Sequence, residues 1–186
     1  MKRIISIVLI SILCLSFFGC SKPPKEAVYI NDWQTDYTAH AFSDLCFPLS
    51  TVMLAIGGER VDSEFEAFSS FAAQVIMLDE KVYVIDTYNH LFMLGDDYSD
   101  VVKRAKEESK SLKDYFDDER NLLPYDSPEV TWVAGTEMFR GGMVYVYTDV
   151  LKEVFSKMGY MYGIRFDSPN HGSIQLIIKR NLTQEG

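Results

Sequence analysis

The sequence contains little histidine or cysteine, two residue types that often bind metals or take part in nucleophilic catalysis. It has only 3 His and 3 Cys, and His40, His90 and His171 do not form the short spacings of a zinc motif. The chain also lacks a phosphate-cradling glycine loop, a Gly-x-Ser-x-Gly elbow and a dinucleotide fingerprint. We therefore expect no metal and no cofactor.

Positive charge is also scarce. The chain has 18 Lys or Arg against 27 Asp or Glu, a formal net charge of -9. Phosphate backbones repel a surface of this sign, which argues against nucleic-acid binding. A basic protein partner or a cation is compatible with the charge, although solubility alone also explains an acidic surface. Asp96-Asp97 and Asp117-Asp118-Glu119 lack the pattern of a calcium loop, so we expect them to be solvated charges flanking a helix.

The first 20 residues carry the most specific signal in the chain. Lys2 and Arg3 precede an apolar run from Ile4 to Phe18 that only serines interrupt. The run is too short to cross a bilayer core, which takes about 20 residues, and it has the form of a secretory signal. An uncleaved anchor is the alternative.

A small residue directly before a cysteine, as in Gly19-Cys20, resembles the lipobox of bacterial lipoproteins. The resemblance implies cleavage before Cys20, lipidation of its thiol and acylation, for example with palmitate, of the new amino terminus. Phe17 and Phe18 stand where that family usually has Leu and a small residue. In enteric-type bacteria Ser21 would direct such a protein to the outer membrane, facing the periplasm.

This interpretation divides the chain into three parts. Residues 1–19 are the signal peptide, residues 20–27 are a lipidated N-terminus with a polar, proline-containing tether, and residues 28–186 are a single domain. Loss of Lys2 and Arg3 leaves 16 basic against 27 acidic residues, a net charge near -11. Cys14 is removed and Cys20 is lipidated, so Cys46 is buried, reactive or paired with another chain; burial is favoured.

Periodicity predicts an α+β fold, with an antiparallel sheet and amphipathic helices packed on one face. We expect three helices with strong capping signals: one from Ser43 to Gly57, one that starts at Ser63 with Glu66, and one that starts at Asp97 or Ser99. The end of the second segment, residues 74–78, reads equally well as a strand. A fourth helix starts at Thr148 or Asp149 and ends at Gly159.

Alternating apolar residues predict the strands. Residues 81–86 and 90–94 flank a turn, and residues 130–133 and 143–147 flank Arg140-Gly141-Gly142. Residues 160–166 and 173–179 form a hairpin, and residues 117–129 form a loop.

Cys46 and His90 are the strongest candidate catalytic pair. A cysteine near a predicted helix start, followed later by His90-Leu91-Phe92-Met93-Leu94-Gly95, resembles papain-like cell-wall peptidases. The resemblance implies a Cys46 thiolate stabilised by the helix terminus and His90 as its base. That family has Asp-Cys-Ser-Gly where this chain has Leu45-Cys46-Phe47-Pro48, and the alternative is a core cysteine with an ordinary histidine.

Tyrosines in the C-terminal strands are the other candidate site. On alternating faces some of Tyr145, Tyr147, Tyr160 and Tyr162 point outward, which suits both a protein interface and an ordinary sheet. We therefore predict a lipid-anchored, periplasm-facing lipoprotein that binds a protein partner, most simply an inhibitor or immunity-type protein against an envelope-targeting toxin. The alternatives are an accessory lipoprotein of an envelope assembly and a cysteine hydrolase of peptidoglycan peptides that uses Cys46 and His90.

Overall fold

A computed structural model describes residues 26–39, 46–61, 73–116, 118–135, 141–167 and 173–181. Within these residues the chain forms helices α2, α3 and α4, a short 3-10 helix η2, and strands β1 to β11. The helices span Leu49–Ala55 (α2), Gly95–Glu108 (α3), Leu112–Tyr115 (η2) and Thr148–Lys157 (α4). The strands span Glu26–Ile30 (β1), Trp33–Ala39 (β2), Cys46–Pro48 (β3), Glu59–Arg60 (β4), Ala73–Leu78 (β5), Lys81–Asp86 (β6), Leu91–Leu94 (β7), Val130–Val133 (β8), Met143–Tyr147 (β9), Tyr160–Asp167 (β10) and Ser173–Arg180 (β11).

The strands belong to three small sheets, and the predicted α+β class is confirmed. The terminal sheet has the order β10-β11-β1-β2, the central sheet β3-β9-β8, and the meander sheet β4-β5-β6-β7. All neighbours are antiparallel except β1 and β11, which run parallel with Val28 opposite Ile174 and Ile30 opposite Leu176. The parallel pair joins the two ends of the described chain.

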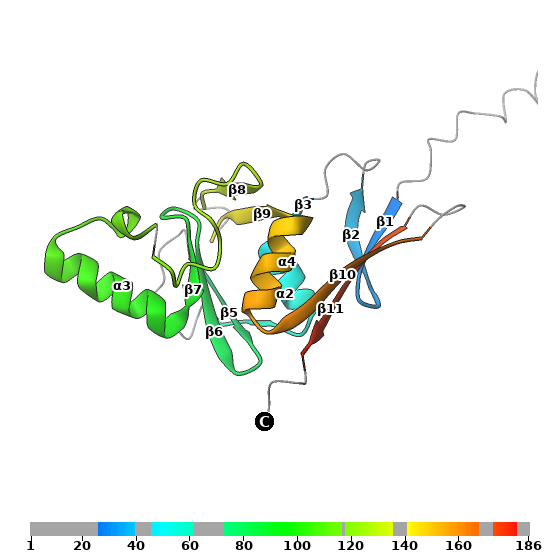
Figure 1. Cartoon of the computed structure of the whole chain (residues 1–186), viewed down its shortest axis with the longest axis horizontal. Coiled ribbons are helices and arrows are strands. Elements are labelled where there is room, and N and C mark those ends of the chain that lie inside the picture. The colour runs from blue at the N-terminus through cyan, green and yellow to red at the C-terminus, as the bar shows by residue number, and fades with distance from the viewer. Residues whose placement is uncertain are drawn as a thin grey trace, which may run out of the picture.

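The main core lies where the three sheets meet α2 and α4 (Figure 1). Both helices place one apolar stripe inward, and each sheet contributes alternate residues, as the strand period requires. The fully buried members include Leu49 and Met53 of α2, Leu151 and Phe155 of α4, and Ile76, Phe92, Val146 and Leu176 of the sheets. One large contiguous core, with smaller clusters beside it, is typical of a single domain.

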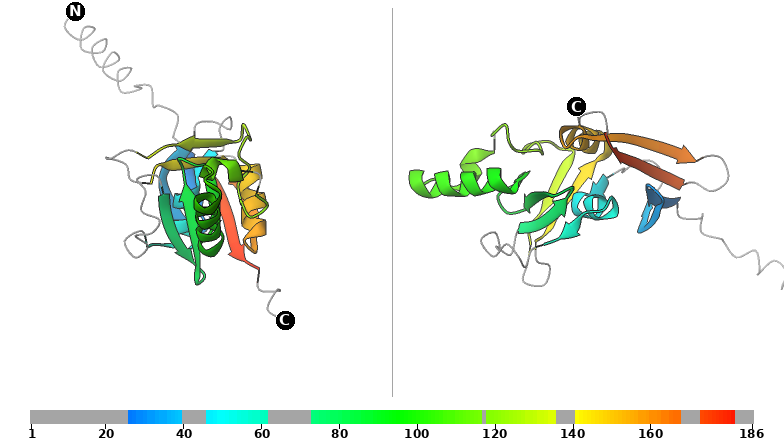
Figure 2. Two further views of the ribbon diagram at one scale, coloured as in Figure 1. Left: turned by 90° about the vertical axis from the view of Figure 1, so that its left-hand side faces the viewer. Right: turned by 90° about the horizontal axis from the view of Figure 1, so that it is seen from below.

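Helix α3 packs on a second, smaller core, whereas α2 and α4 pack on the main core. Tyr83 and Ile85 of β6 face the main core, whereas Val84 between them faces α3. On the α3 side this residue packs with Val101 and Ala105. The meander sheet is therefore covered on both faces, and α3 lies at one end of the long axis, opposite β1 and β2 (Figures 1 and 2).

All three α-helices begin directly after a strand. The residue before each helix is the last residue of β3, β7 or β9, namely Pro48, Leu94 and Tyr147, and none of them makes a side-chain cap hydrogen bond. The predicted starts for α3, at Asp97 or Ser99, are therefore late by several residues. Ser99 lies inside the helix, where its hydroxyl donates to the Gly95 carbonyl.

The predicted helix from Ser43 also starts too early. Ser43 lies outside the described residues, Cys46 belongs to β3, and α2 begins at Leu49. Pro48 accounts for this, because the residue before a proline is pushed out of the helical region into an extended conformation. The predicted helix start at Ser63 and Glu66 lies outside the described residues, and residues 73–78 form strand β5.

Other predictions are confirmed. The strands at 81–86, 130–133 and 143–147 have the predicted bounds, and the C-terminal hairpin extends each predicted strand by one residue. Gly159 ends α4 with φ +88, the left-handed value for which a glycine was expected. Strands β1 and β2 were not predicted, and β1 begins at Glu26, inside the segment expected to be a tether.

Candidate functional site

The predicted site residues lie in separate places. Gly19 and Cys20 lie outside the described residues. Cys46 is half-buried in β3, opposite Tyr147 of β9. His90 lies in the turn between β6 and β7 with φ +58, a left-handed value that is uncommon for histidine.

The arrangement of Cys46 and His90 differs from the peptidase pattern. Cys46 lies in a strand, and α2 begins three residues later at Leu49. Nδ1 of His90 is buried and has no hydrogen-bond partner among the described residues. A nucleophile and its base are recognised by the hydrogen bond between them, and no such bond is formed at this nitrogen.

The His90 ring instead belongs to an aromatic cluster. It stacks on Trp132 with ring centroids 5.1 Å apart and planes inclined by 4°, and it lies 5.0 Å from the ring of Tyr125. Phe116 stacks on Tyr125 and lies 6.1 Å from His90. We call these four residues the His90 cluster; they join the β6–β7 turn to β8 and to the chain after α3.

Burial and a nearby cation favour the neutral form of the His90 ring. Burial lowers the pKa of His90 and the nearby Lys113 ammonium lowers it further, while Asp86 and Asp126 act in the opposite direction. Nε1 of Trp132 is also buried without a partner among the described residues. The cluster is thus held by ring stacking rather than by hydrogen bonds through these nitrogens.

A buried carboxylate shapes the turn that carries His90. Asp86 is only 1% exposed, and Oδ1 accepts hydrogen bonds from the backbone N–H groups of Tyr88 and Asn89, each at 3.0 Å. Its other oxygen accepts from Asn89 Nδ2 and from the hydroxyl of Tyr98, each at 2.7 Å. These four bonds hold the turn, which projects Tyr88 into solvent with 60% of its surface exposed.

Asn121 fixes the loop after η2 to the same turn. Its Oδ1 accepts from the backbone N–H of Phe92 at 2.8 Å, and its Nδ2 donates to the carbonyl of His90 at 3.3 Å. The N–H of Leu122 also donates to the carbonyl of Phe92. Three hydrogen bonds therefore join the loop after η2 to the start of β7.

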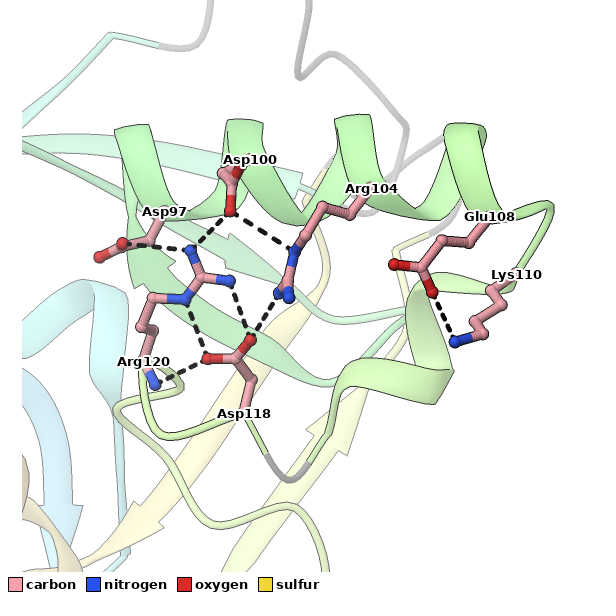
Figure 3. Close-up of polar contacts among 7 residues, drawn as sticks. All are labelled: Asp97, Asp100, Arg104, Glu108, Lys110, Asp118 and Arg120. Atoms are coloured by element: carbon pink, nitrogen blue, oxygen red, sulfur yellow. Dashed lines mark hydrogen bonds and ion pairs between the residues drawn. The ribbon is translucent and has the colours of Figure 1, made fainter.

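An ionic network binds this loop to α3 (Figure 3). Asp118 contacts Arg104 at 2.8 Å and Arg120 at 2.9 Å, and Arg120 also contacts Asp100 at 2.9 Å. Hydrogen bonds from the Arg120 side chain, with others from its backbone and from Arg104, lower the pKa of Asp118 despite the opposing effect of burial. Asp118 was expected to be a solvated charge, but it is the centre of the network.

Together α3, η2 and the following loop form an acidic end of the molecule, which we call the α3 lobe (residues 95–129). It contains 11 Asp or Glu and 6 Lys or Arg. The carboxylates of Asp96 and Glu107 lie on its exposed surface, while those of Asp97 and Asp118 take part in the network. The lobe lies at the opposite end of the molecule from the start of β1 (Figures 1 and 2).

The predicted tyrosines divide between two faces. Tyr145 and Tyr147 are half-buried on the outward side of β9, since the alternating residues Val144 and Val146 are buried on its other side. Tyr160 and Tyr162 face the main core. Among the tyrosines whose side chains the structure describes, Tyr88 is the most exposed. It lies in a turn, so the alternation expected of a strand does not single it out.

No protein-family model, curated protein sequence or solved structure matches this chain. Within the part of the chain that the structure describes, no three His, Cys, Asp or Glu side chains come together as a metal site would require. In the same residues, no helix has the length and apolar character needed to cross a bilayer.

Proposed function

We propose that this chain is a lipoprotein, anchored through Cys20 and facing the periplasm, that binds a basic protein partner. In this proposal it acts as an inhibitor of the immunity type, which neutralises a toxin directed at the cell envelope. The observation that carries the proposal is the α3 lobe, an acidic surface at the end of the domain farthest from the start of β1.

Rigidity of the lobe supports a binding role. The ionic network and the His90 cluster hold α3 and its loop in one position, so little conformational entropy is lost when a partner binds. An exposed Tyr88 beside the charged surface supplies the aromatic contact that is enriched in protein interfaces. Complementary charge would also steer a basic partner to this end of the molecule and accelerate association.

The test is capture of a partner by the mature protein and by charge-reversed variants. Asp96→Lys with Glu107→Lys changes two exposed carboxylates of α3 that lie outside the contacts to Asp118. The matched control is Glu59→Lys with Glu153→Lys, the same change in charge on exposed residues away from the lobe. We expect the first variant to lose the partner and the control to retain it.

Equal capture by both variants would refute the α3 lobe as the binding surface. Recovery of a component of an envelope assembly, rather than a toxin, would instead support the accessory lipoprotein. Mass spectrometry of the same preparation tests the anchor, because a lipidated Cys20 adds the mass of its acyl chains.

A further inference from the structure

The outward face of the terminal sheet differs from the rest of the surface. Leu176 and Ile178 of β11 lie in the main core and Ile174 is buried on the same face, so Gln175, Ile177 and Lys179 point the other way. By the same register Met161 and Arg165 of β10 and Tyr29 of β1 lie on the outward side. Met161 is 56% exposed, and Tyr29 and Ile177 are half-buried.

The covalent chain limits how far this sheet can lie from a lipid anchor. β1 belongs to the terminal sheet and begins at Glu26, six residues after Cys20. A fully extended chain of that length spans at most about 20 Å. A bilayer that holds Cys20 therefore lies within that distance of the end of β1, and the α3 lobe lies at the far end of the molecule (Figure 1).

Charge changes sign between these two ends. The tether and the terminal sheet, residues 21–39 and 160–181, contain 5 Lys or Arg and 4 Asp or Glu. The α3 lobe contains 11 acidic and 6 basic residues. Arg165 and Lys179 are the cationic residues of the outward face, and the register places Asp167, opposite Ser173, on the same face.

We propose that the outward face of the terminal sheet rests on the bilayer surface and that the α3 lobe points away from it. This inference depends on the lipid anchor of the proposed function. Arg165 and Lys179 would lie at the level of anionic lipid phosphates and be attracted to them. Tyr29, Met161 and Ile177 would contact the interfacial region, where amphipathic and apolar side chains are accommodated.

The inference can be tested with an environment-sensitive fluorophore on the lipidated, leader-cleaved protein in vesicles that contain phosphatidylglycerol. A Cys46→Ser background leaves one labelling site, Ile177→Cys on the outward face or Glu107→Cys on α3 as the control. We expect the label at 177 to shift to shorter wavelength and to be quenched by doxyl lipids. The label at 107 is expected to behave as in water.

Two results would overturn the inference: water-like emission at both positions, or quenching at position 107 instead of 177. A second variant, Arg165→Glu with Lys179→Glu, is expected to reduce quenching at 177, whereas Lys103→Glu with Lys106→Glu on α3 should leave it unchanged. Mass spectrometry of the same sample separates the two proposals. A lipidated Cys20 with a water-like label at 177 refutes only the orientation, whereas an unmodified Cys20 refutes the anchor and the orientation together.

Discussion

At the scale of single residues, Asp118 links helix α3 to the loop that follows η2, a contact that the pattern of apolar residues does not predict. Its carboxylate accepts hydrogen bonds from Arg104 of α3 and from Arg120 of the following loop. Its side chain is 15% exposed, so solvent screens these contacts only partly. The loop is therefore anchored by charge as well as by packing.

Asp118→Asn should destabilise the folded protein by about 2 kcal/mol, because the two arginines would lose the least exposed carboxylate of the network and keep only contacts to the more exposed Asp97 and Asp100. The measurement is the free energy of unfolding from urea titration at neutral pH. Glu119→Gln is the matched control, since it removes the same charge from an exposed neighbour. Equal losses in the two variants would show that only the overall charge matters.

The same carboxylate predicts a response to acid. The pKa of Asp118 is lowered in the folded state, so its stabilising effect is present above the unfolded pKa, about 3.9, and is lost as pH falls through the lower folded value.

His90 responds at milder acidity. Its pKa is lowered by burial, so the folded state favours neutral His90 while the unfolded chain takes up a proton below about 6.5.

We therefore expect the free energy of unfolding to decrease between pH 7.5 and pH 5.5 in the wild-type protein. The decrease should be smaller in the His90→Asn variant. Asparagine is suited to the left-handed φ of +58 at this position. His40 and His171 are present in both proteins, so their contributions cancel in the comparison. Urea titration at the two pH values gives the measurement, and an identical pH dependence in both proteins would exclude His90 as the group responsible.

At the scale of secondary-structure elements, the meander sheet and β9 are joined through two glycines. Gln74 is buried in β5, and its Nε2 donates to the carbonyls of Gly141, at 3.2 Å, and Gly142. Thr87 donates to the Gly141 carbonyl. A Cβ at Gly142 would lie 2.3 Å from both Thr87 Oγ1 and the Val133 carbonyl oxygen, and φ there is +58.

Gly142→Ala should therefore cost about 3 kcal/mol, from steric overlap with backbone and from the left-handed φ together. Gly159→Ala is expected to cost about 1 kcal/mol, because φ is +88 but no atom lies within 4 Å of the added methyl group. Gly163→Ala, with open space and no positive φ, should change stability by less than about 0.5 kcal/mol. Thermal unfolding of the three variants tests this order, which a uniform response would contradict.

At the scale of the whole molecule, the domain has an acidic end and a near-neutral end. The acidic end is the α3 lobe and the near-neutral end is the terminal sheet that follows the tether. If the proposed anchor at Cys20 is present, this separation would place the surface that attracts a basic partner at the end of the molecule away from the membrane. It would also reduce the repulsion that an acidic protein meets at an anionic bilayer.

Replacing residues 1–20 with a cleavable secretory signal that lacks a cysteine should release the protein from the membrane fraction without changing its stability, because both the apolar run and the proposed lipidation site are removed. The described cores are built from residues between Val28 and Ile178, so the fold does not depend on the lipidated position. In the proposed orientation, contacts of Arg165 and Lys179 with anionic lipid, at roughly 1 kcal/mol each, would be too weak to retain the domain without the anchor. Fractionation and urea titration of both proteins provide the check, and retention in the membrane fraction would show that another anchor exists.

Sequence reasoning succeeded for elements with a strong local pattern. β6, β8, β9, α4 and the β10–β11 hairpin were predicted within one or two residues, because alternation, turn residues and Gly159 are local signals. It failed where a neighbouring strand determined the structure. β1 and β3 are short and lack a distinctive pattern, and they become strands because β11 and β9 supply their hydrogen-bond partners.

The amino-acid order is sufficient for the leader-like segment, the excess of carboxylates and the α+β class, because these depend on composition and on contacts between near neighbours. The folded arrangement was needed to reveal that Asp118 meets Arg104, that His90 stacks on Trp132, and that the first strand pairs with the last. Such pairings join residues that many positions separate, and which of them form depends on the energy of the complete packed core rather than on any local pattern.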